Sequence, residues 1–311
     1  MKANIHTLKL VYKPMSNFEA EQVKNDEWVA ERLKQSHLYM ICQRENPRFT
    51  SKPSIETGQF LKLHFKDSKS SSSCEIDLLA LIDILNITVD NLHLKSTDNM
   101  IIIRTVIDDV VGDVIDWFDI KKITYLKSMR CEYIKGFDNY KDFCDYQLHY
   151  VGISKQDNSL KRLLVKPHDK RLRVLSNQYP VCSKTRVTDE ITLLFFRIEP
   201  LAITTIQSDS DLDDYDPEAD VDYIRVIADA EKAFVKMLQS SYNTVKFANY
   251  PQGTDGLYDT GLDRYGYLLG EDIKLVTDTD YFMGEYSDLI PDSDMIFIEG
   301  DVVEIKHYNG I

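Results

Sequence analysis

The segment "DYIRVIADAEKAFVKMLQSSYN", residues 222–243, constrains the fold more than any other part of the chain, because its apolar side chains follow a helical period. Ile224, Ile227, Phe234, Val235 and Leu238 fall on one stripe. A helix with such a stripe needs another layer against which to bury it, and the 43% apolar content of the chain supplies a core. The sequence therefore predicts a globular protein in which this helix packs on a second layer.

Glu231 interrupts this stripe, four residues after Ile227 and four residues before Val235. A carboxylate on a core-facing stripe is costly unless a cation, a metal or a hydrogen-bond donor satisfies it. Glu231 is therefore a candidate for a partner of one of these three kinds. The alternative is a carboxylate at the edge of the stripe that reaches solvent or pairs with a lysine.

A second unusual segment is "LHYVGISKQDNSLKRLLVKPH", residues 148–168. Its first part predicts a strand that carries Tyr150, and its polar middle predicts a loop. A helix carrying Arg162 follows, and Pro167 ends or kinks that helix. His168 comes next and opens a second helical piece. A tyrosine, an arginine and a histidine thus meet in one strand–loop–helix unit.

The charge of the chain is segregated, although the net charge is −14. Residues 150–186 hold nine Lys and Arg against two Asp, whereas residues 205–311 hold seven Lys and Arg against twenty-four acids. A basic patch within an acidic protein indicates a phosphate-binding face; the alternative is a solvated helix face. The candidate nucleic-acid contacts are Lys155, Lys161, Lys166, Lys170, Arg171 and Arg173.

The rest of the pattern predicts three consecutive domains. Residues 1–125 read as an α+β domain of unknown role that offers a surface for a protein partner. It has a helix over "SNFEAEQVKNDEWVAERLKQ" with Ser16 as N-cap, strands at "HLYMICQ" and "FLKLHFK", and a loop at "SKSSSSC". Residues 126–251 would carry the chemistry, with an acidic insertion over 208–222. Residues 252–311 read as an acidic, β-rich extension.

The order of these residues resembles the GIY-YIG nuclease superfamily. The matching parts are "YVG" at 150–152, Arg162 on the next helix, His168, Glu231 on a later helix and Asn243 after "QSSYN". The resemblance covers residues 131–251. It implies a small three-stranded antiparallel sheet flanked by helices, and hydrolysis of phosphodiester bonds with Mg²⁺ or Mn²⁺. It also implies a setting in antiviral defence or mobile-element biology, with DNA preferred over RNA as partner.

The resemblance also implies a role for each matching residue. Tyr150 would orient or deprotonate the attacking water, and Arg162 would stabilise charge on the phosphate. His168 would assist proton transfer or contact the phosphate, Glu231 would hold the metal, and Asn243 would brace the site. The physics of phosphoryl chemistry agrees, because it needs a metal and a fixed cation against developing negative charge.

The chain departs from the family at its first motif, because no Gly-Ile-Tyr precedes the second strand. Tyr133 in "CEYIKG" is the preferred replacement, and Tyr140 in "FDNYKDF" is the alternative. Three functions are therefore compatible with the sequence. The first is a metal-dependent endonuclease, the second is a catalytically inactive module that binds nucleic acid or protein, and the third is a nucleic-acid mimic.

The five cysteines predict a reducing compartment. They are odd in number and scattered, without a CxxC pair, which favours free thiols over a disulfide framework or a zinc site. No stretch of the sequence reaches the ~18–20 apolar residues of a membrane span. These features predict a cytoplasmic protein.

Overall fold

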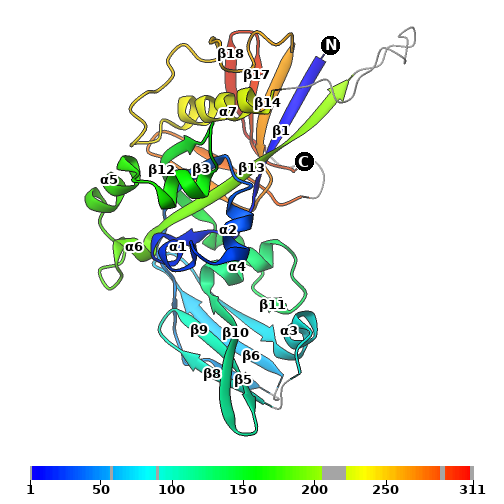
Figure 1. Cartoon of the computed structure of the whole chain (residues 1–311), viewed down its shortest axis with the longest axis vertical. Helices are drawn as coiled ribbons and strands as arrows, with labels where there is room; N and C mark the ends of the chain where they lie inside the picture. Colours follow the sequence, from blue (N-terminus) through cyan, green and yellow to red (C-terminus); the bar gives the residue numbers. More distant parts are fainter. Residues whose placement is uncertain (1, 57–58, 89–90, 205–221, 288–290, 309–311) are drawn as a thin grey trace. The chain divides into compact units, whose positions relative to one another are not determined.

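The computed structural model describes residues 2–56, 59–88, 91–204, 222–287 and 291–308. These residues form two compact units (Figure 1). Unit 1 comprises residues 1–44, 145–179 and 187–311, and unit 2 comprises residues 45–144 and 180–186. This division differs from the three consecutive ranges 1–125, 126–251 and 252–311. The acidic insertion 208–222 lies outside the described residues except for Asp222.

Unit 1 is built on one mixed sheet, which has ten strands among the described residues. Its order is β16-β15-β12-β3-β13-β1-β14-β17-β18, with β2 beside β13. The β1–β14 and β12–β15 pairs are parallel, and the others are antiparallel. The strands are β1 (Lys2–Leu10), β2 (Met15–Ser16), β3 (Leu38–Gln43), β12 (Asp145–Ile153), β13 (Ile191–Thr204), β14 (Arg264–Leu269), β15 (Lys274–Val276), β16 (Tyr281–Met283), β17 (Met295–Glu299) and β18 (Val302–Lys306).

The predicted fold class, a small three-stranded sheet with a separate N-terminal α+β domain, is therefore wrong. The antiparallel set β12-β3-β13 exists, but it lies within the ten-stranded sheet. On one side β1 joins β13 to β14, and on the other side β15 joins β12. The sequence pattern identifies strands but not their long-range partners, because a buried apolar run fits beside many neighbours.

The helices of unit 1 begin where local capping signals place them. Ser16 accepts a hydrogen bond from the Glu19 amide, which confirms Ser16 as an N-cap. The single helix predicted after Ser16 is two helices, because Asp26 caps a second one. The helices are α1 (Asn17–Val23), α2 (Glu27–Leu33), the π-helical turn η2 (Lys161–Val165), α5 (Asp169–Asn177), α6 (Val187–Glu190) and α7 (Tyr223–Leu238).

Helix α7 confirms the stripe at residues 222–243. Its buried side chains include Ile227, Phe234, Val235 and Leu238, whereas Ile224 is exposed near its first turn. Figure 1 shows α7 lying across the sheet, and it contacts β12 and β17. The layer that receives the apolar stripe is thus the large sheet, so Glu231 is held against strands from distant parts of the chain.

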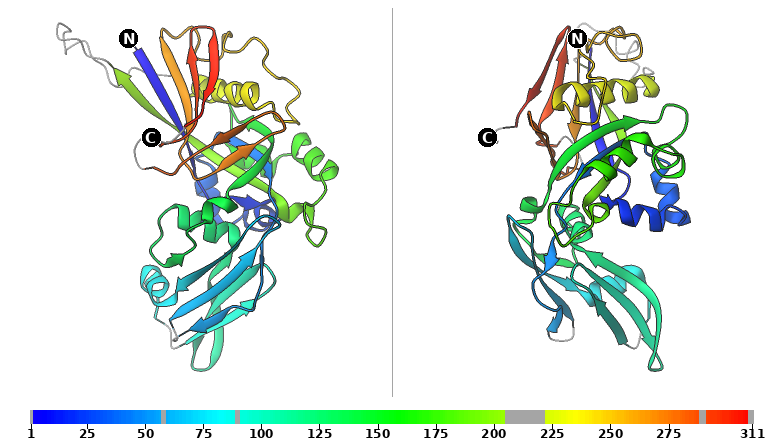
Figure 2. Two further views of the ribbon diagram at one scale, coloured as in Figure 1. Left: turned by 180° about the vertical axis from the view of Figure 1, so that it is seen from behind. Right: turned by 90° about the vertical axis from the view of Figure 1, so that its left-hand side faces the viewer.

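Unit 2 packs two antiparallel sheets face to face, as the side view of Figure 2 shows. Its core joins Leu61 and Phe65 of one sheet to Ile101, Ile103 and Phe118 of the other. The predicted loop "SKSSSSC" is wrong, because residues from Ser71 onward form a strand. The elements are β4 (Arg48–Phe49), β5 (Ser54–Glu56), β6 (Phe60–Lys66), β7 (Ser71–Asp77), α3 (Leu78–Leu85), β8 (Asn91–Ser96), β9 (Met100–Ile107), β10 (Val110–Asp119), α4 (Ile120–Ser128), β11 (Ile134–Gly136) and the 3₁₀ turn η1 (Tyr140–Phe143).

Candidate functional site

Two tyrosines from neighbouring strands stand at the centre of the candidate site. Tyr39 of β3 and Tyr150 of β12 have ring centroids 6.3 Å apart. Gly152 lies directly opposite Tyr39 in the β3–β12 ladder. A Cβ at Gly152 would stand 2.7 Å from the Tyr39 hydroxyl oxygen and 2.6 Å from Cε1 of Tyr150. The glycine of "YVG" is therefore needed here because both tyrosine rings lie over its backbone.

A bulge in β12 helps to bring these rings onto one face. The ladder pairs Leu148 with Cys42 but Tyr150 with Ile41, so His149 is the extra residue. A bulge changes the direction in which the following side chains point, and bulges are frequent beside active sites. The register places Tyr150 and Gly152 on the face of the sheet that carries Tyr39.

His168 contacts the Tyr39 hydroxyl and is the N-cap of α5. Its Nδ1 accepts the Arg171 amide hydrogen at 3.1 Å, so the neutral ring carries its proton on Nε2. Nε2 therefore donates to the Tyr39 oxygen at 2.8 Å. Burial, together with the charges of Arg162 and Arg171, lowers the pKa of His168 to about 4. His168 is thus a neutral hydrogen-bond donor at neutral pH.

Arg162 lies on η2, which its buried neighbours Leu163 and Leu164 hold in place. Burial raises the pKa of Tyr39 well above its ordinary value, and the charge of Arg162 and a hydrogen bond from it act against that rise. Burial also raises the pKa of Tyr150 to about 12, again opposed by Arg162. The guanidinium group is therefore hydrogen-bonded to Tyr39 and lies within the range of electrostatic interaction with Tyr150.

The loop that leads to Arg162 is fastened to the start of β3. The Ser36 hydroxyl donates to the Ser159 hydroxyl at 2.8 Å, and both serines are fully buried. The Ser159 amide donates to the Ser36 carbonyl at 2.8 Å, and the Ser154 amide donates to the His37 carbonyl at 2.9 Å. These bonds place η2 relative to Tyr39.

Glu231 approaches the two tyrosines from α7. Its charge raises the pKa of Tyr39 and of Tyr150, so the carboxylate lies within the range of electrostatic interaction with both hydroxyls. Burial raises the pKa of Glu231 to about 7, with Asp255 adding to the rise and Lys155 and Lys232 opposing it. Among the described residues, Glu231 has no hydrogen-bond or ion-pair partner.

This carboxylate fits a divalent cation. A half-buried carboxylate without a protein partner is a suitable ligand for Mg²⁺ or Mn²⁺, which commonly bind through one or two carboxylates, water and substrate phosphate. Within the part of the chain that the structure describes, no three His, Cys, Asp or Glu side chains cluster as a metal site. A cation here would have Glu231 as a protein ligand and would complete its shell with water and phosphate oxygens.

Asn243 braces the strand that carries Tyr150. Its side-chain oxygen accepts the Val151 amide hydrogen at 2.9 Å, and its Nδ2 donates to the Val151 carbonyl at 2.8 Å. Strand β15 pairs with β12 only as far as Gln147. The Asn243 amide therefore takes the place of a neighbouring strand just beyond that point. Ser240 donates to the same Asn243 oxygen at 2.7 Å.

The choice of Tyr133 as partner of Tyr150 is wrong. Strand β12 has β3 and β15 as its neighbours, so the adjacent tyrosine is Tyr39. Tyr133 instead belongs to the core of unit 2, against Phe118, and Tyr140 packs there too. The sequence signal that was missed is a tyrosine in the buried run "HLYMICQ".

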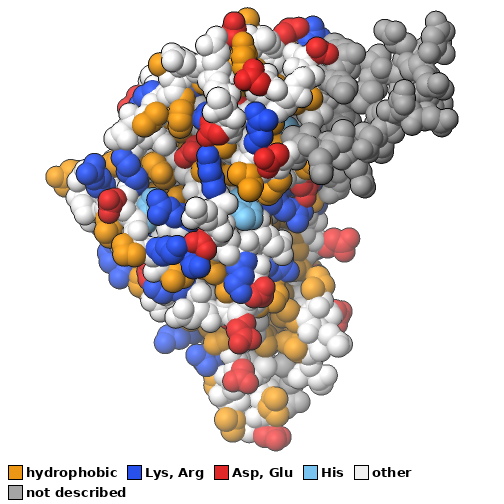
Figure 3. Space-filling model, turned by 45° about the horizontal axis from the view of Figure 1, so that its top comes forward, with side chains coloured by type: hydrophobic (Ala, Val, Ile, Leu, Met, Phe, Trp, Pro, Cys, Tyr) orange, Lys and Arg blue, Asp and Glu red, His pale blue; other side chains and the backbone are white. Residues whose placement is uncertain are grey.

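Acidic side chains neutralise much of the positive charge on the predicted basic face. Lys161 and Lys166 both pair with Asp157, and Lys155 pairs with Asp255. Arg171 is buried and bonds Asn17, Glu21 and the Leu163 carbonyl, so it holds α5 rather than a ligand. Among the described residues, Lys170 and Arg173 form no ion pair. Figure 3 shows Lys and Arg side chains and Asp and Glu side chains on the same side of the described surface.

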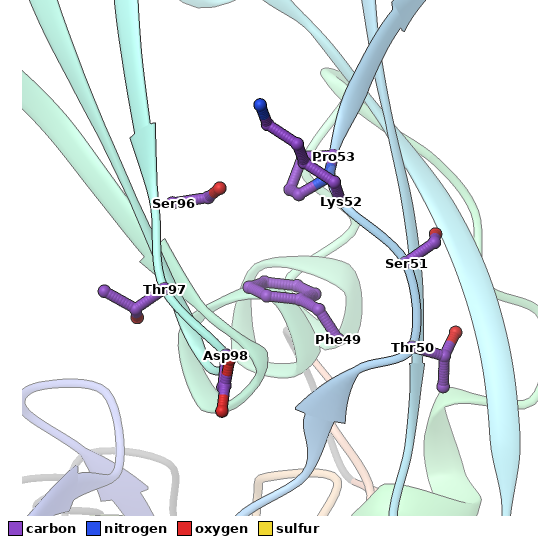
Figure 4. A pocket seen from close by; sticks show the side chains of 8 residues that line it. All are labelled: Phe49, Thr50, Ser51, Lys52, Pro53, Ser96, Thr97 and Asp98. Carbon is purple, nitrogen blue, oxygen red and sulfur yellow. The ribbon is translucent and has the colours of Figure 1, made fainter.

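A separate open cleft of about 330 Å³ lies within unit 2 (Figure 4). It lies between the residues around Phe49 and the turn after β8, where Ser96, Thr97 and Asp98 face Lys52 and Pro53. Its lining offers no paired carboxylates and no histidine or cysteine, so it adds no residue to the chemistry described above.

No family model matches the chain, and comparison with curated proteins and with solved structures found no similar protein. Across the residues described, no helix is long and apolar enough to cross a membrane.

Proposed function

We propose that the protein is a metal-dependent endonuclease of the GIY-YIG type, which hydrolyses phosphodiester bonds in nucleic acid. The observation that carries this proposal is the meeting of five side chains from three segments. Tyr39 comes from β3 and Glu231 from α7, and both lie near Tyr150, Arg162 and His168 of residues 148–168. Convergent perturbed acids and bases with a fixed cation are what an active site requires.

A directed chain of hydrogen bonds fixes the orientation of the two tyrosine hydroxyls. The Arg171 amide donates to His168, and His168 donates to Tyr39. Tyr39 in turn forms a hydrogen bond that lowers the pKa of Tyr150, but burial outweighs it and raises that pKa to about 12. Tyr150 is therefore a neutral hydroxyl at neutral pH, which can accept a hydrogen bond from the attacking water and orient it.

Arg162 and Glu231 supply the electrostatic part. Arg162 is exposed and hydrogen-bonded to Tyr39, so its cation is accessible to a phosphate that gains negative charge under attack. A divalent cation at Glu231 would neutralise charge on the phosphate oxygens. Asn243 keeps the Tyr150 strand in register for this arrangement.

The setting of the reaction is part of the same proposal. The partner is nucleic acid, with DNA preferred over RNA, and the compartment is the cytoplasm. All five cysteines are free thiols, which suits a reducing environment. A role in antiviral defence or mobile-element biology extends the same resemblance.

The test is a cleavage assay with labelled single- and double-stranded DNA and RNA in Mg²⁺ and in Mn²⁺. Wild type should cut, Glu231→Gln should not, and Tyr39→Phe should slow cleavage by about 10²-fold or more. Tyr133→Phe is the matched control, because it removes the same hydroxyl in unit 2 and should cut normally. Binding without cleavage by wild type would replace the enzyme with the inactive binding module.

A further inference from the structure

Two lysines from different elements stand beside Glu231. Lys232 follows Glu231 in α7, and Lys155 lies in the loop after β12. Both positive charges lower the pKa of Glu231. The Lys232 side chain is 12% exposed and that of Lys155 is 44% exposed. One ammonium group is therefore largely fixed and the other remains accessible.

Asp255 bridges these two lysines. Its Oδ2 is 2.9 Å from Lys155 Nζ, and its Oδ1 pairs with Lys232 Nζ. The two bonds lower the pKa of Asp255 to about 2. The Asp255 side chain is nevertheless 53% exposed, so a ligand from solvent can reach it.

The segment that carries Asp255 is held against α7 by hydrogen bonds to a buried aspartate of that helix. Asp229 is fully buried and accepts hydrogen bonds from the Tyr250 hydroxyl at 2.6 Å and the Leu257 amide at 2.7 Å. A Cβ at Gly256 would stand 2.4 Å from an Asp229 oxygen, so only glycine fits there. These contacts hold the Asp255 backbone near the lysines.

We propose that Lys155 and Lys232 together bind a phosphate of a nucleic-acid strand. In the free protein the Asp255 carboxylate occupies this site in place of the phosphate. The identity of the ligand rests on the proposed function, whereas the site itself rests on these contacts. Asp255 is thus an autoinhibitory group that the strand displaces when it binds next to Glu231.

The chemistry of the two anions supports this exchange. A carboxylate and a phosphodiester each share one negative charge between two oxygens, and each can bind two ammonium groups at once. Two neighbouring lysines without an anion repel each other, so the pair needs an anion both in the free protein and in the strand-bound protein. An exposed ion pair contributes little to stability, which makes Asp255 replaceable.

Binding of a fluorescent single-stranded DNA oligonucleotide to the full chain tests the proposal, with EDTA present to prevent cleavage. Asp255→Asn should bind about three- to tenfold more tightly than wild type. The plot of log affinity against log salt should steepen by roughly 0.7 for each added phosphate contact. Lys155→Gln and Lys232→Gln, each added to Asp255→Asn, should abolish the gain.

Glu299→Gln is the matched control, because it removes one charge from a similarly exposed ion pair with Arg264. An equal gain in Asp255→Asn and Glu299→Gln would overturn the proposal, as would a gain that survives both lysine substitutions. Binding of inorganic phosphate should be compared at the same concentration of phosphate groups. If Asp255→Asn bound inorganic phosphate more tightly than wild type by the same factor, the assignment of the site to a nucleic-acid strand would be overturned. None of these readouts needs cleavage, so failure of the nuclease assay is a separate result.

Discussion

Replacing Asn243 with Ala should destabilise unit 1 by more than an ordinary polar substitution. The change removes both side-chain hydrogen bonds to the backbone of Val151, which is fully buried. A buried amide and a buried carbonyl are then left without partners, at about 1–3 kcal/mol each. The expected loss in free energy of unfolding is therefore about 2–5 kcal/mol. Ser240→Ala, which removes one bond to Asn243, should lose about 1 kcal/mol.

The assay is urea denaturation of the full chain in a Trp117→Phe background. Trp28 of unit 1 is then the single remaining tryptophan, and its fluorescence follows that unit. Asn249→Ala is the control in the same unit, because Asn249 is exposed and its side chain forms no hydrogen bond among the described residues, so the change should alter stability by under about 0.5 kcal/mol. A loss for Asn243→Ala no greater than that of Asn249→Ala would refute the bracing role.

Three further predictions follow from single contacts. Gly152→Ala should cost about 1–3 kcal/mol in a thermal or urea melt, because its Cβ meets both tyrosine rings; a neutral result would contradict that contact. Burial raises the pKa of Glu271 to about 8, so its stabilising contribution is full below pH ~4.5 and falls as pH rises toward 8. Wild type should therefore lose stability relative to Glu271→Gln across that window by on the order of a few kcal/mol, and parallel pH curves would refute this. Arg162→Ala should lower kcat for cleavage while leaving oligonucleotide affinity nearly unchanged, since its cation acts on developing charge; weaker binding with unchanged kcat would make it a simple backbone contact.

Local signals in the sequence predicted the local structure well. Ser16 with Glu19 three residues later marked a helix start, and the structure confirms that cap. The stripe at residues 222–243 predicted α7, and the run "FLKLHFK" predicted β6. Each of these signals is contained in a short segment, where capping and periodicity act directly.

Pairings between distant segments could not be read in the same way. Tyr39 and Tyr150 are neighbours in the sheet, but residues 45–144 of unit 2 lie between their strands in the sequence. Tyr133 was preferred over Tyr140 because its segment "CEYIKG" fits a strand better, and the ladder places Tyr39 beside β12 instead. Similarly, β1 joins β13 to β14 through registers that no local pattern encodes.

The candidate site was predictable where one helix or strand presents a chemically unusual side chain. Glu231 was identified from its place on an apolar stripe, and its charge acts on both tyrosine hydroxyls. Arg171 shows the limit of counting charges, because its position in a basic run did not reveal that it is buried against Asn17 and Glu21. Burial and pairing depend on the tertiary fold.

The central claim is that Glu231 holds a divalent cation beside the paired tyrosines. Calorimetric titration of Mn²⁺ into wild type, Glu231→Gln and the surface control Glu299→Gln tests it most directly. At pH 8 the Glu231 carboxyl is mostly ionised, because its pKa is about 7. Wild type and Glu299→Gln should bind Mn²⁺ alike, and Glu231→Gln should bind at least about tenfold more weakly. Equal Mn²⁺ affinity in all three proteins would contradict the proposal that Glu231 is a ligand of the cation.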